Sequence, residues 1–237
     1  MGIEGLKADE INSKVSQYWS VSVTEETSST QIDLAKNFQP GKVLVAEFQS
    51  AGRGRLDRKF EVPPRKGLTF SFCISAEQDF GWIPLITGLA VARAINNYLG
   101  EAKVEIKWPN DLLINGAKLA GILSEKTAHG AVVGVGINIY QTEDELPIKN
   151  AISLSMVKDV DRNDLLIEIL NELGVALSNI EIEKTRYRDL CGTIGKPVRA
   201  ILPTGEVVED RAIGISEEGA LLLNSREISV GDIVHLR

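Results

Sequence analysis

Two short stretches of this sequence combine residue types that suit the binding of phosphate and carboxylate groups. The first runs from Gln49 to Arg55 and reads Gln-Ser-Ala-Gly-Arg-Gly-Arg. Gly52 and Gly54 let the backbone approach a ligand, and the planar guanidinium groups of Arg53 and Arg55 can pair with anionic oxygens. We therefore expect a cationic loop that becomes ordered when an anionic ligand binds.

The second stretch is Lys107-Trp-Pro-Asn-Asp111, a tight polar turn at the end of an apolar run. Asn110 and Asp111 place an amide and a carboxylate at the end of an expected strand. A carboxylate there can hold a divalent cation that neutralises a triphosphate, so Asp111 is the candidate metal ligand. Taken alone, each stretch could be a solvated turn, and neither has the Gly-Lys-Ser/Thr ending of a Walker A loop.

Single residues add to these two motifs. Lys118 lies among small residues, as either an edge residue or a cation placed in a pocket. Ser29 and Thr30 could cap the helix that follows or contact a ligand. Gly134 and Gly136 alternate along an expected strand and bare its backbone on one face, as a closely packed ligand would require.

The composition is that of an ordinary globular protein of 237 residues, 43% hydrophobic, with a net charge of -7. This charge argues against a surface that binds nucleic acid as a whole, so the basic cluster from Arg53 to Lys66 is a local feature. The two cysteines form no CxxC motif, and no secretory signal or membrane-spanning run is visible, which favours the cytoplasm. Because His129 and His235 adjoin no motif, we expect both at turns or on the surface, and positioned cations rather than a hydrolase triad.

The periodicity predicts an α+β fold, with a central mixed β-sheet packed with helices and a small C-terminal β-barrel. Helices are expected at 8–19 with Asp9 as N-cap, 32–38, 83–99 and 165–180. Strands are expected at 43–48, 68–74, 104–108 and 132–139, with a hairpin at 112–123 turning at Asn115-Gly116. Short strands follow from residue 196. The expected parts are an N-terminal extension (1–19), a catalytic domain (20–190) and the C-terminal domain (191–237).

The motif series resembles that of the biotin protein ligases, also called biotin–[acetyl-CoA-carboxylase] ligases. The matching segments are Ser29-Thr30-Gln31, Gln49 to Arg55, Lys107 to Asp111, Lys118 to Gly121, and Gly134 to Asn138. They occur in the family's order and at its spacings. The resemblance extends over about residues 20 to 237 and includes a C-terminal module like the family's SH3-like domain.

The resemblance implies an enzyme, a biotin–[biotin carboxyl-carrier protein] ligase, that works in two steps. Biotin carboxylate attacks the α-phosphate of ATP, with Mg²⁺ as the metal ion, and yields biotinyl-5′-AMP and pyrophosphate. A lysine of the biotin carboxyl carrier protein then attacks the mixed anhydride and releases AMP. Because two anions must meet in the first step, fixed cations are the main requirement.

Residue roles also follow from the resemblance. Lys118 and Arg55 match the catalytic positions, and Asp111 the metal position. The residues implied for biotin are Ser29, Thr30, Gln31, Gln49, Gly52, Arg53, Gly54, Arg55, Lys118, Gly121, Leu123, Gly134 and Gly136. Those implied for ATP are Arg55, Arg58, Phe60, Lys107, Asn110 and Asn138. The sequence departs from the family at three places, with Gln31 for Asn, Phe60 for Trp and Thr69 for Tyr.

The sequence leaves alternative functions open. A lipoate or octanoate ligase usually shows an Arg-Arg…Ser-Gly-Gly-Gly motif, which this sequence lacks. A nucleic-acid-binding module could use the cluster from Arg53 to Lys66, but the net charge and the lack of interleaved aromatic residues argue against it. Lys118 and the loop arginines argue against a silent biotin sensor. Only about twenty residues precede Val21, so DNA binding is not expected, nor is membrane binding, while a homodimer stays open.

Overall fold

The computed structural model describes residues 3–55, 58–75, 79–100 and 103–236. Its helices are α1 (Ala8–Lys14), α2 (Thr30–Lys36), α3 (Ile83–Leu99), α4 (Arg162–Leu177) and α5 (Ile180–Leu190). The larger sheet contains β1 (Ser20–Thr27), β2 (Lys42–Gln49), β3 (Gly67–Ile74), β4 (Glu105–Lys107), β5 (Asp111–Ile114), β6 (Ala117–Thr127) and β7 (Gly130–Asn138). The smaller one contains β8 (Pro197–Ile201), β9 (Val207–Ile215), β10 (Leu221–Leu223), β11 (Glu227–Ile228) and β12 (Asp232–His235).

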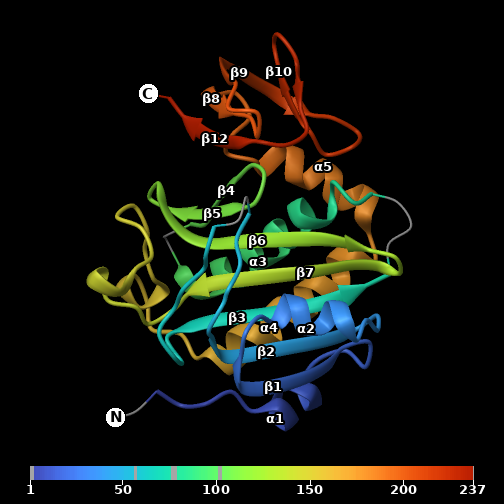
Figure 1. Cartoon of the computed structure of the whole chain (residues 1–237), viewed down its shortest axis with the longest axis vertical. Coiled ribbons are helices and arrows are strands. Elements are labelled where there is room, and N and C mark those ends of the chain that lie inside the picture. Colours follow the sequence, from blue (N-terminus) through green and yellow to red (C-terminus); the bar gives the residue numbers. More distant parts are fainter. Residues whose placement is uncertain (1–2, 56–57, 76–78, 101–102, 237) are drawn as a thin grey trace.

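The larger sheet has the strand order β1-β2-β3-β7-β6-β5-β4 (Figure 1). β1 and β2 are parallel and every other neighbouring pair is antiparallel, so the predicted mixed sheet is confirmed. Two rows of residues cross its centre, Ser71–Gly134–Leu123 and Thr69–Gly136–Gly121. Three of these six positions are glycine and two carry only a hydroxyl side chain, which leaves room above the strands.

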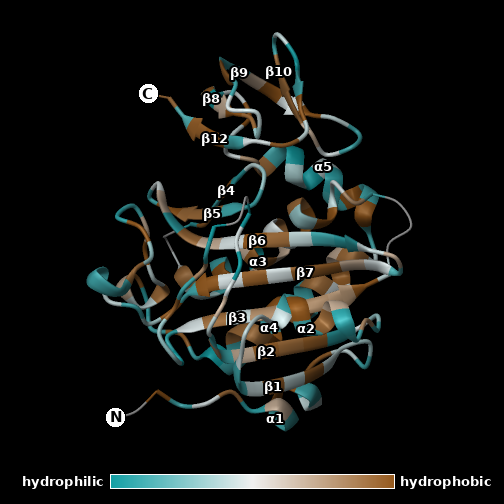
Figure 2. Ribbon diagram, viewed as in Figure 1, coloured by the Kyte–Doolittle hydropathy of each residue, from teal (hydrophilic) through white to brown (hydrophobic). Residues whose placement is uncertain are grey.

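Helices cover the two faces of this sheet unequally. α3 packs on β4, β5 and β6 and is backed by α4, whereas α2 packs on β2, β3 and β7 (Figure 1). α3 is buried along most of its length and ends where Gly100 adopts a positive φ of 66°. The hydrophobic colouring of the central strands and of α3 follows this core (Figure 2).

The small sheet, in the order β11-β10-β9-β8-β12, is antiparallel and confirms the strand-rich module expected near the C-terminus. It is attached to the larger sheet through two buried tryptophans. The indole of Trp82 donates to Glu217 O at 2.7 Å, and that of Trp108 donates to Gly219 O at 3.0 Å. The main chain approaches closely there, since a Cβ on Gly81 would lie 2.0 Å from Glu218 O.

A buried ion pair fixes both ends of the loop between β2 and β3. Arg162 Nη1 donates to Glu47 Oε2 at 2.7 Å and to Gly67 O at 3.1 Å. Both side chains of the pair are 2% exposed. Glu47 Oε1 also accepts from Leu6 N and Arg162 Nη2 donates to Glu4 O, so the N-terminal segment completes the pair. The cationic loop therefore begins and ends at anchored residues.

Some elements differ from those expected. The predicted helix at 8–19 ends at Lys14, and Asp9 lies inside it rather than at its N-cap, which is Lys7. Trp19 therefore lies outside this helix, and its indole donates to Leu170 O at 2.8 Å. The hairpin is confirmed, with positive φ angles of 51° at Asn115 and 77° at Gly116. β1 and α5 were not predicted.

Candidate active site

One cavity lies above the glycine rows and collects the predicted site residues. Gly52 and Lys107 alone among them do not line it. Its lining includes Ser29, Thr30, Gln31, Gln49, Arg53, Gly54, Arg55, Arg58, Phe60, Asn110, Asp111, Lys118, Gly121, Leu123, Gly134, Gly136 and Asn138. Sequence reasoning did not find Ser71, Pro147, Ile148, Ala151 or Asp232, which also line it.

The end of the cavity beside α2 is lined by neutral hydrogen-bonding groups; we call it the neutral end. The main-chain N–H of Thr30 donates to Gln49 Oε1 at 2.8 Å, and the hydroxyl of Thr30 lies 2.7 Å from that of Ser71. Ser71 Oγ donates to Gln31 Oε1 at 3.2 Å, and Gln31 Nε2 donates to Val132 O at 2.9 Å. These bonds connect α2, β2, β3 and β7 and hold the neutral end in one arrangement.

Side chains of the protein cover the two glycines expected to face a ligand. A Cβ on Gly134 would lie 2.6 Å from Gln31 Oε1. A Cβ on Gly136 would lie 2.6 Å from the ring of Phe60, which comes from the cationic loop. In this structure the space above Gly134 is therefore filled by the Gln31 amide, and the space above Gly136 by the Phe60 ring. Phe60, expected beside the nucleotide, packs on the central glycine row.

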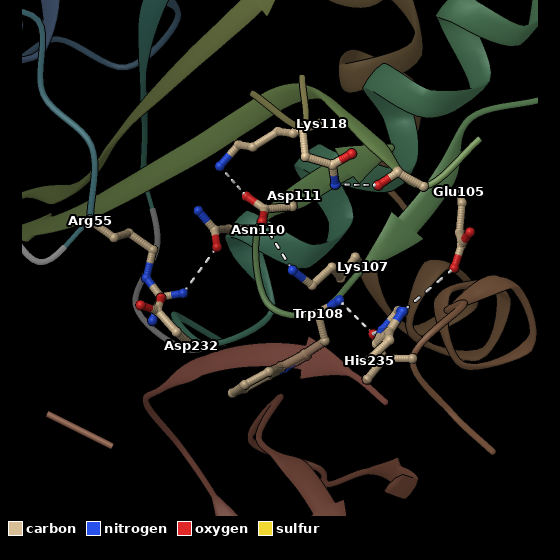
Figure 3. Close-up of polar contacts among 12 residues, drawn as sticks. Arg55, Glu105, Lys107, Trp108, Asn110, Asp111, Lys118, Asp232 and His235 are labelled. Atoms are coloured by element: carbon tan, nitrogen blue, oxygen red, sulfur yellow. Dashed lines mark hydrogen bonds and ion pairs between the residues drawn. The ribbon is translucent and has the colours of Figure 1, made fainter. Parts of the chain in front are cut away.

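The opposite end of the cavity, the charged end, is built around Asp111 (Figure 3). Lys118 Nζ donates to Asp111 Oδ1 at 2.5 Å, and Lys107 Nζ lies 3.6 Å from Asp111 Oδ2. One carboxylate therefore separates two ammonium groups that belong to two different sequence motifs. Lys118 is one-third exposed and reaches toward the cavity from β6.

The loop arginines reach across the cavity to the small sheet. Arg55 donates to Asn110 Oδ1 at 3.0 Å (Figure 3). It also donates to Gly231 O at 3.4 Å. Burial lowers the pKa of the Arg55 guanidinium, which nevertheless stays charged at neutral pH. Arg58 pairs with Asp232 at the start of β12. The C-terminal module therefore supplies part of the charged end.

The remaining predicted residues have protein partners. Arg53 pairs with Glu125 on β6 at 3.0 Å. Gly52 is required by a close approach, because a Cβ there would lie 2.2 Å from Phe60 O. Asn138 is buried, and its amide donates to Ile152 O at 3.2 Å and to the main-chain oxygen of Lys118 at 3.4 Å. Asn138 was expected to contact ATP. In this structure its amide instead holds the main chain at Lys118 and Ile152.

His235 was expected at a turn or on the surface, but it lies on β12 and its side chain is largely covered. Its side chain is 18% exposed and lies at the junction of the two sheets, where Thr193 Oγ1 is 3.0 Å from His235 Nε2 (Figure 3). The same hydroxyl accepts a hydrogen bond from the main-chain N–H of Trp108 at 3.0 Å. This series of hydrogen bonds connects β12 to the 107–111 turn. Burial, with the positive charges of Lys196 and Lys107, lowers the pKa of His235 to about 4.

Asp111 is the only predicted metal ligand, and the described residues contain no group of three or more His, Cys, Asp or Glu side chains that could hold a metal ion. A Mg²⁺ ion that arrives with a triphosphate needs only one or two protein carboxylates. Asp111 fits such a role, provided that its two lysine partners move to the phosphates.

A cavity with a neutral hydrogen-bonding end and a cationic end suits a ligase that activates a carboxylic acid with a nucleotide. Comparison with known proteins agrees with this class. The family model described as "Biotin/lipoate A/B protein ligase family" matches residues 20–139, and that described as "Biotin protein ligase C terminal domain" matches residues 193–236. The chain therefore belongs to the biotin protein ligases of this family.

The relatives are similar over most of the chain. A biotin–[acetyl-CoA-carboxylase] ligase of Mycobacterium tuberculosis is 34% identical over 97% of this chain and 94% of its own length. The bifunctional ligase/repressor BirA of Escherichia coli is 34% identical over 85% of this chain and 67% of its own length. The structure of the Aquifex aeolicus biotin protein ligase in complex with biotin and ATP has a TM-score of 0.78 and 29% identity, covering 92% of this chain and 98% of that one.

Proposed function

We propose that the cavity joins biotin to ATP and that its two ends bind different parts of the substrates. The observation that carries this proposal is the position of Lys118, whose ammonium group lies at the charged end on Asp111 and 3.5 Å from the position of a Cβ on Gly121. A biotin carboxylate that reaches Lys118 would meet the α-phosphate there. The oxygen attacks phosphorus, the bond to the β-phosphate oxygen breaks, and pyrophosphate leaves.

Lys118 and Arg55 act in this step by holding negative charge. Charge grows on the oxygens of the α-phosphate as the new bond forms, and a fixed cation stabilises it more in the transition state than in the ground state. Lys118 must exchange Asp111 for the substrate oxygens. Lys107, on the other side of the same carboxylate, is then available to the phosphate chain.

The neutral end suits the ureido head of biotin. The Ser29 hydroxyl and the Gln49 amide line it, and among the described residues no protein partner satisfies the Ser29 hydroxyl or the Gln49 Nε2. An octanoyl or lipoyl chain would leave such groups without hydrogen bonds, which costs a substrate far more than a missing methylene. This argues for biotin over the lipoate alternative.

Magnesium enters the proposal together with ATP, with Asp111 as its one protein ligand. When bound, it would neutralise the triphosphate. Arg58 flanks the nucleotide, Phe60 does so once its ring leaves the space above Gly136, and Arg53 and Gly54 close over biotin.

The second step transfers biotin to a lysine of a carrier protein. The amine nitrogen attacks the carbonyl carbon of the anhydride, AMP leaves, and the nitrogen loses a proton.

The proposal also includes domain boundaries near residues 20 and 190, a cytoplasmic location and an action without DNA. The two free cysteines are both buried, as suits a reducing compartment. No helix in the described ranges is long and apolar enough to cross a membrane.

The test is to incubate the protein with ATP and magnesium and with either biotin or lipoate, and to measure acyl-adenylate and pyrophosphate. We expect both products with biotin alone, and transfer of biotin when a carrier domain is added. Formation of lipoyl-adenylate in place of biotinyl-adenylate would contradict the proposal.

A further inference from the structure

Gln31 was expected to line the biotin site in place of the family's Asn, and in this structure its amide is already engaged by the protein. Nε2 donates to Val132 O at 2.9 Å and lies 3.5 Å from Leu123 O, while Oε1 accepts from Ser71. The side chain is 3% exposed. Both amide hydrogens therefore point at main-chain carbonyls rather than into the cavity.

The same side chain lies across the row Ser71–Gly134–Leu123. Its partners Ser71 and Leu123 are the outer members of that row, and the middle member has no side chain. The amide fills the space above Gly134, where a Cβ would lie 2.6 Å from Oε1. Because α2 begins at Thr30, Gln31 projects from the first turn of the helix onto the sheet and closes the cavity there.

The floor of the cavity continues from this row in one direction. Gly136 and Gly121 lie two residues further along their strands, which is roughly 7 Å away. Lys118 Nζ lies 3.5 Å from the position of a Cβ on Gly121, so the ammonium group follows the second row. The distance from Gln31 to Lys118 therefore sets how long an acid can be if its head touches one and its carboxylate the other.

We propose that Gln31 is the end wall of the biotin site and sets its depth, selecting the acid by the size of its head rather than by a hydrogen bond to it. This inference rests on the proposed function. It predicts that Gln31 and Gly134 behave as a pair, because each occupies space that the other leaves free.

The first experiment is a double-mutant cycle. Gly134→Ala should push the Gln31 amide into the cavity and raise the KM for biotin about tenfold, with a smaller effect on kcat. Gln31→Asn shortens the wall by one methylene and should restore most of the lost affinity in the Gly134→Ala background. Neither change should alter the KM for ATP as strongly, because both lie at the neutral end.

Gly136→Ala is the matched control. It adds the same methyl group one row away, but this methyl group meets the ring of Phe60 and not Gln31. Gln31→Asn should therefore fail to rescue Gly136→Ala. Equal rescue of both alanine variants would contradict a specific pairing of Gln31 with Gly134.

The second experiment probes depth directly with biotin analogues that carry a methyl group on one or the other ureido nitrogen. For at least one of them, Gln31→Asn should raise kcat/KM relative to biotin by about tenfold over the wild type. If Gly134→Ala does not fold, as judged by its melting temperature and circular dichroism, this series decides alone. An unchanged preference for both analogues would overturn the inference.

Different results would contradict the biotin-activating function and the depth-setting role of Gln31. A wild-type protein that forms no biotinyl-adenylate contradicts the proposed function itself. A wild-type protein that forms it, with variants that show neither rescue nor a changed preference, leaves that function standing and removes Gln31 as its depth-setting residue.

Discussion

The two ends of the cavity are stabilised by different kinds of contact. At the neutral end, Thr30, Gln31 and Ser71 are buried and bonded to uncharged groups of the protein. At the charged end, cations pair with carboxylates of the protein, as in Lys118 with Asp111 and Arg58 with Asp232. A substrate can add to the first set of contacts, but it must replace the second. The neutral end is therefore preorganised, and the charged end works by exchange of partners.

The largest effect expected from this difference is at Lys118. Lys118→Ala should lower the rate of adenylate formation about 10²–10³-fold, because a cation that stabilises the charge on the α-phosphate is lost. Pyrophosphate release in single-turnover conditions measures this. Lys126→Ala removes an exposed lysine from the same strand and serves as the control. Normal pyrophosphate release by Lys118→Ala would refute its role.

Acid pH should weaken the support behind the charged end. The pKa of His235 in the folded state, about 4, lies below its ordinary value of 6.5, so the unfolded chain takes up the proton first. The contribution of His235 to the free energy of unfolding is complete above pH 6.5. It is lost as the pH falls toward 4, by at most about 3 kcal/mol. Urea unfolding of the wild type and of His235→Gln across this range measures the difference. If the free energy of unfolding changes with pH in the same way for both proteins, His235 is not the cause of the loss of stability in acid.

Arg55 should control how long the intermediate is retained. Arg55→Gly removes a half-buried guanidinium from the charged end, and a lost charged hydrogen bond is worth about 1.5–3 kcal/mol. Biotinyl-AMP should leave the purified enzyme correspondingly faster in a filtration assay. Arg93→Gly is unsuitable as a control because of its buried partner Glu183; Arg226→Gly, at an exposed pair, is the better choice. Equal retention by Arg55→Gly and the wild type would show that the loop cation is dispensable.

The neutral end should respond with a smaller and more selective change. Ser71→Ala removes the hydroxyl between Thr30 and Gln31 and should weaken biotin binding by about 1 kcal/mol. The KM for ATP should change little. Calorimetry with each ligand separates the two, and a larger effect on ATP would break the assignment of the two ends.

Salt should distinguish the ends without any mutation. Raising the ionic strength from about 0.1 to about 1 M shortens the screening length from about 10 to about 3 Å, which weakens partly exposed charge pairs. We expect the KM for ATP to rise severalfold and that for biotin to change less. A larger rise for biotin would show that charge, and not neutral hydrogen bonding, dominates its binding.

The sequence predicts strongly periodic elements well and weakly periodic ones poorly. α3 lies at the predicted residues 83–99 because its apolar positions repeat regularly and Gly100 ends it. α5 escaped prediction because its buried residues include Glu183 and Lys184, whose ion pairs replace apolar contacts. In β1 only Val21 is fully buried, so an alternating pattern is hardly visible.

The same limit applies to the site. Local motifs identified the cations and glycines, because glycine and arginine within a few residues of each other indicate an anion-binding loop and can be read from the sequence alone. They could not identify the partners. The pair of Arg58 with Asp232 joins residues 174 apart in the sequence, and the covering of Gly134 by Gln31 depends on how α2 sits on the sheet. Such contacts are properties of the tertiary fold.

The attachment of the small sheet by Trp82 and Trp108 offers an optical signal. Only three tryptophans occur in the chain, and these two are buried at the junction, while Trp19 lies in the core near α4. Partial separation of the small sheet would hydrate the two junction indoles and shift the intrinsic fluorescence to longer wavelength, with Trp19 as an internal reference. The protein thus carries its own probe for whether the C-terminal module stays docked while the substrates exchange.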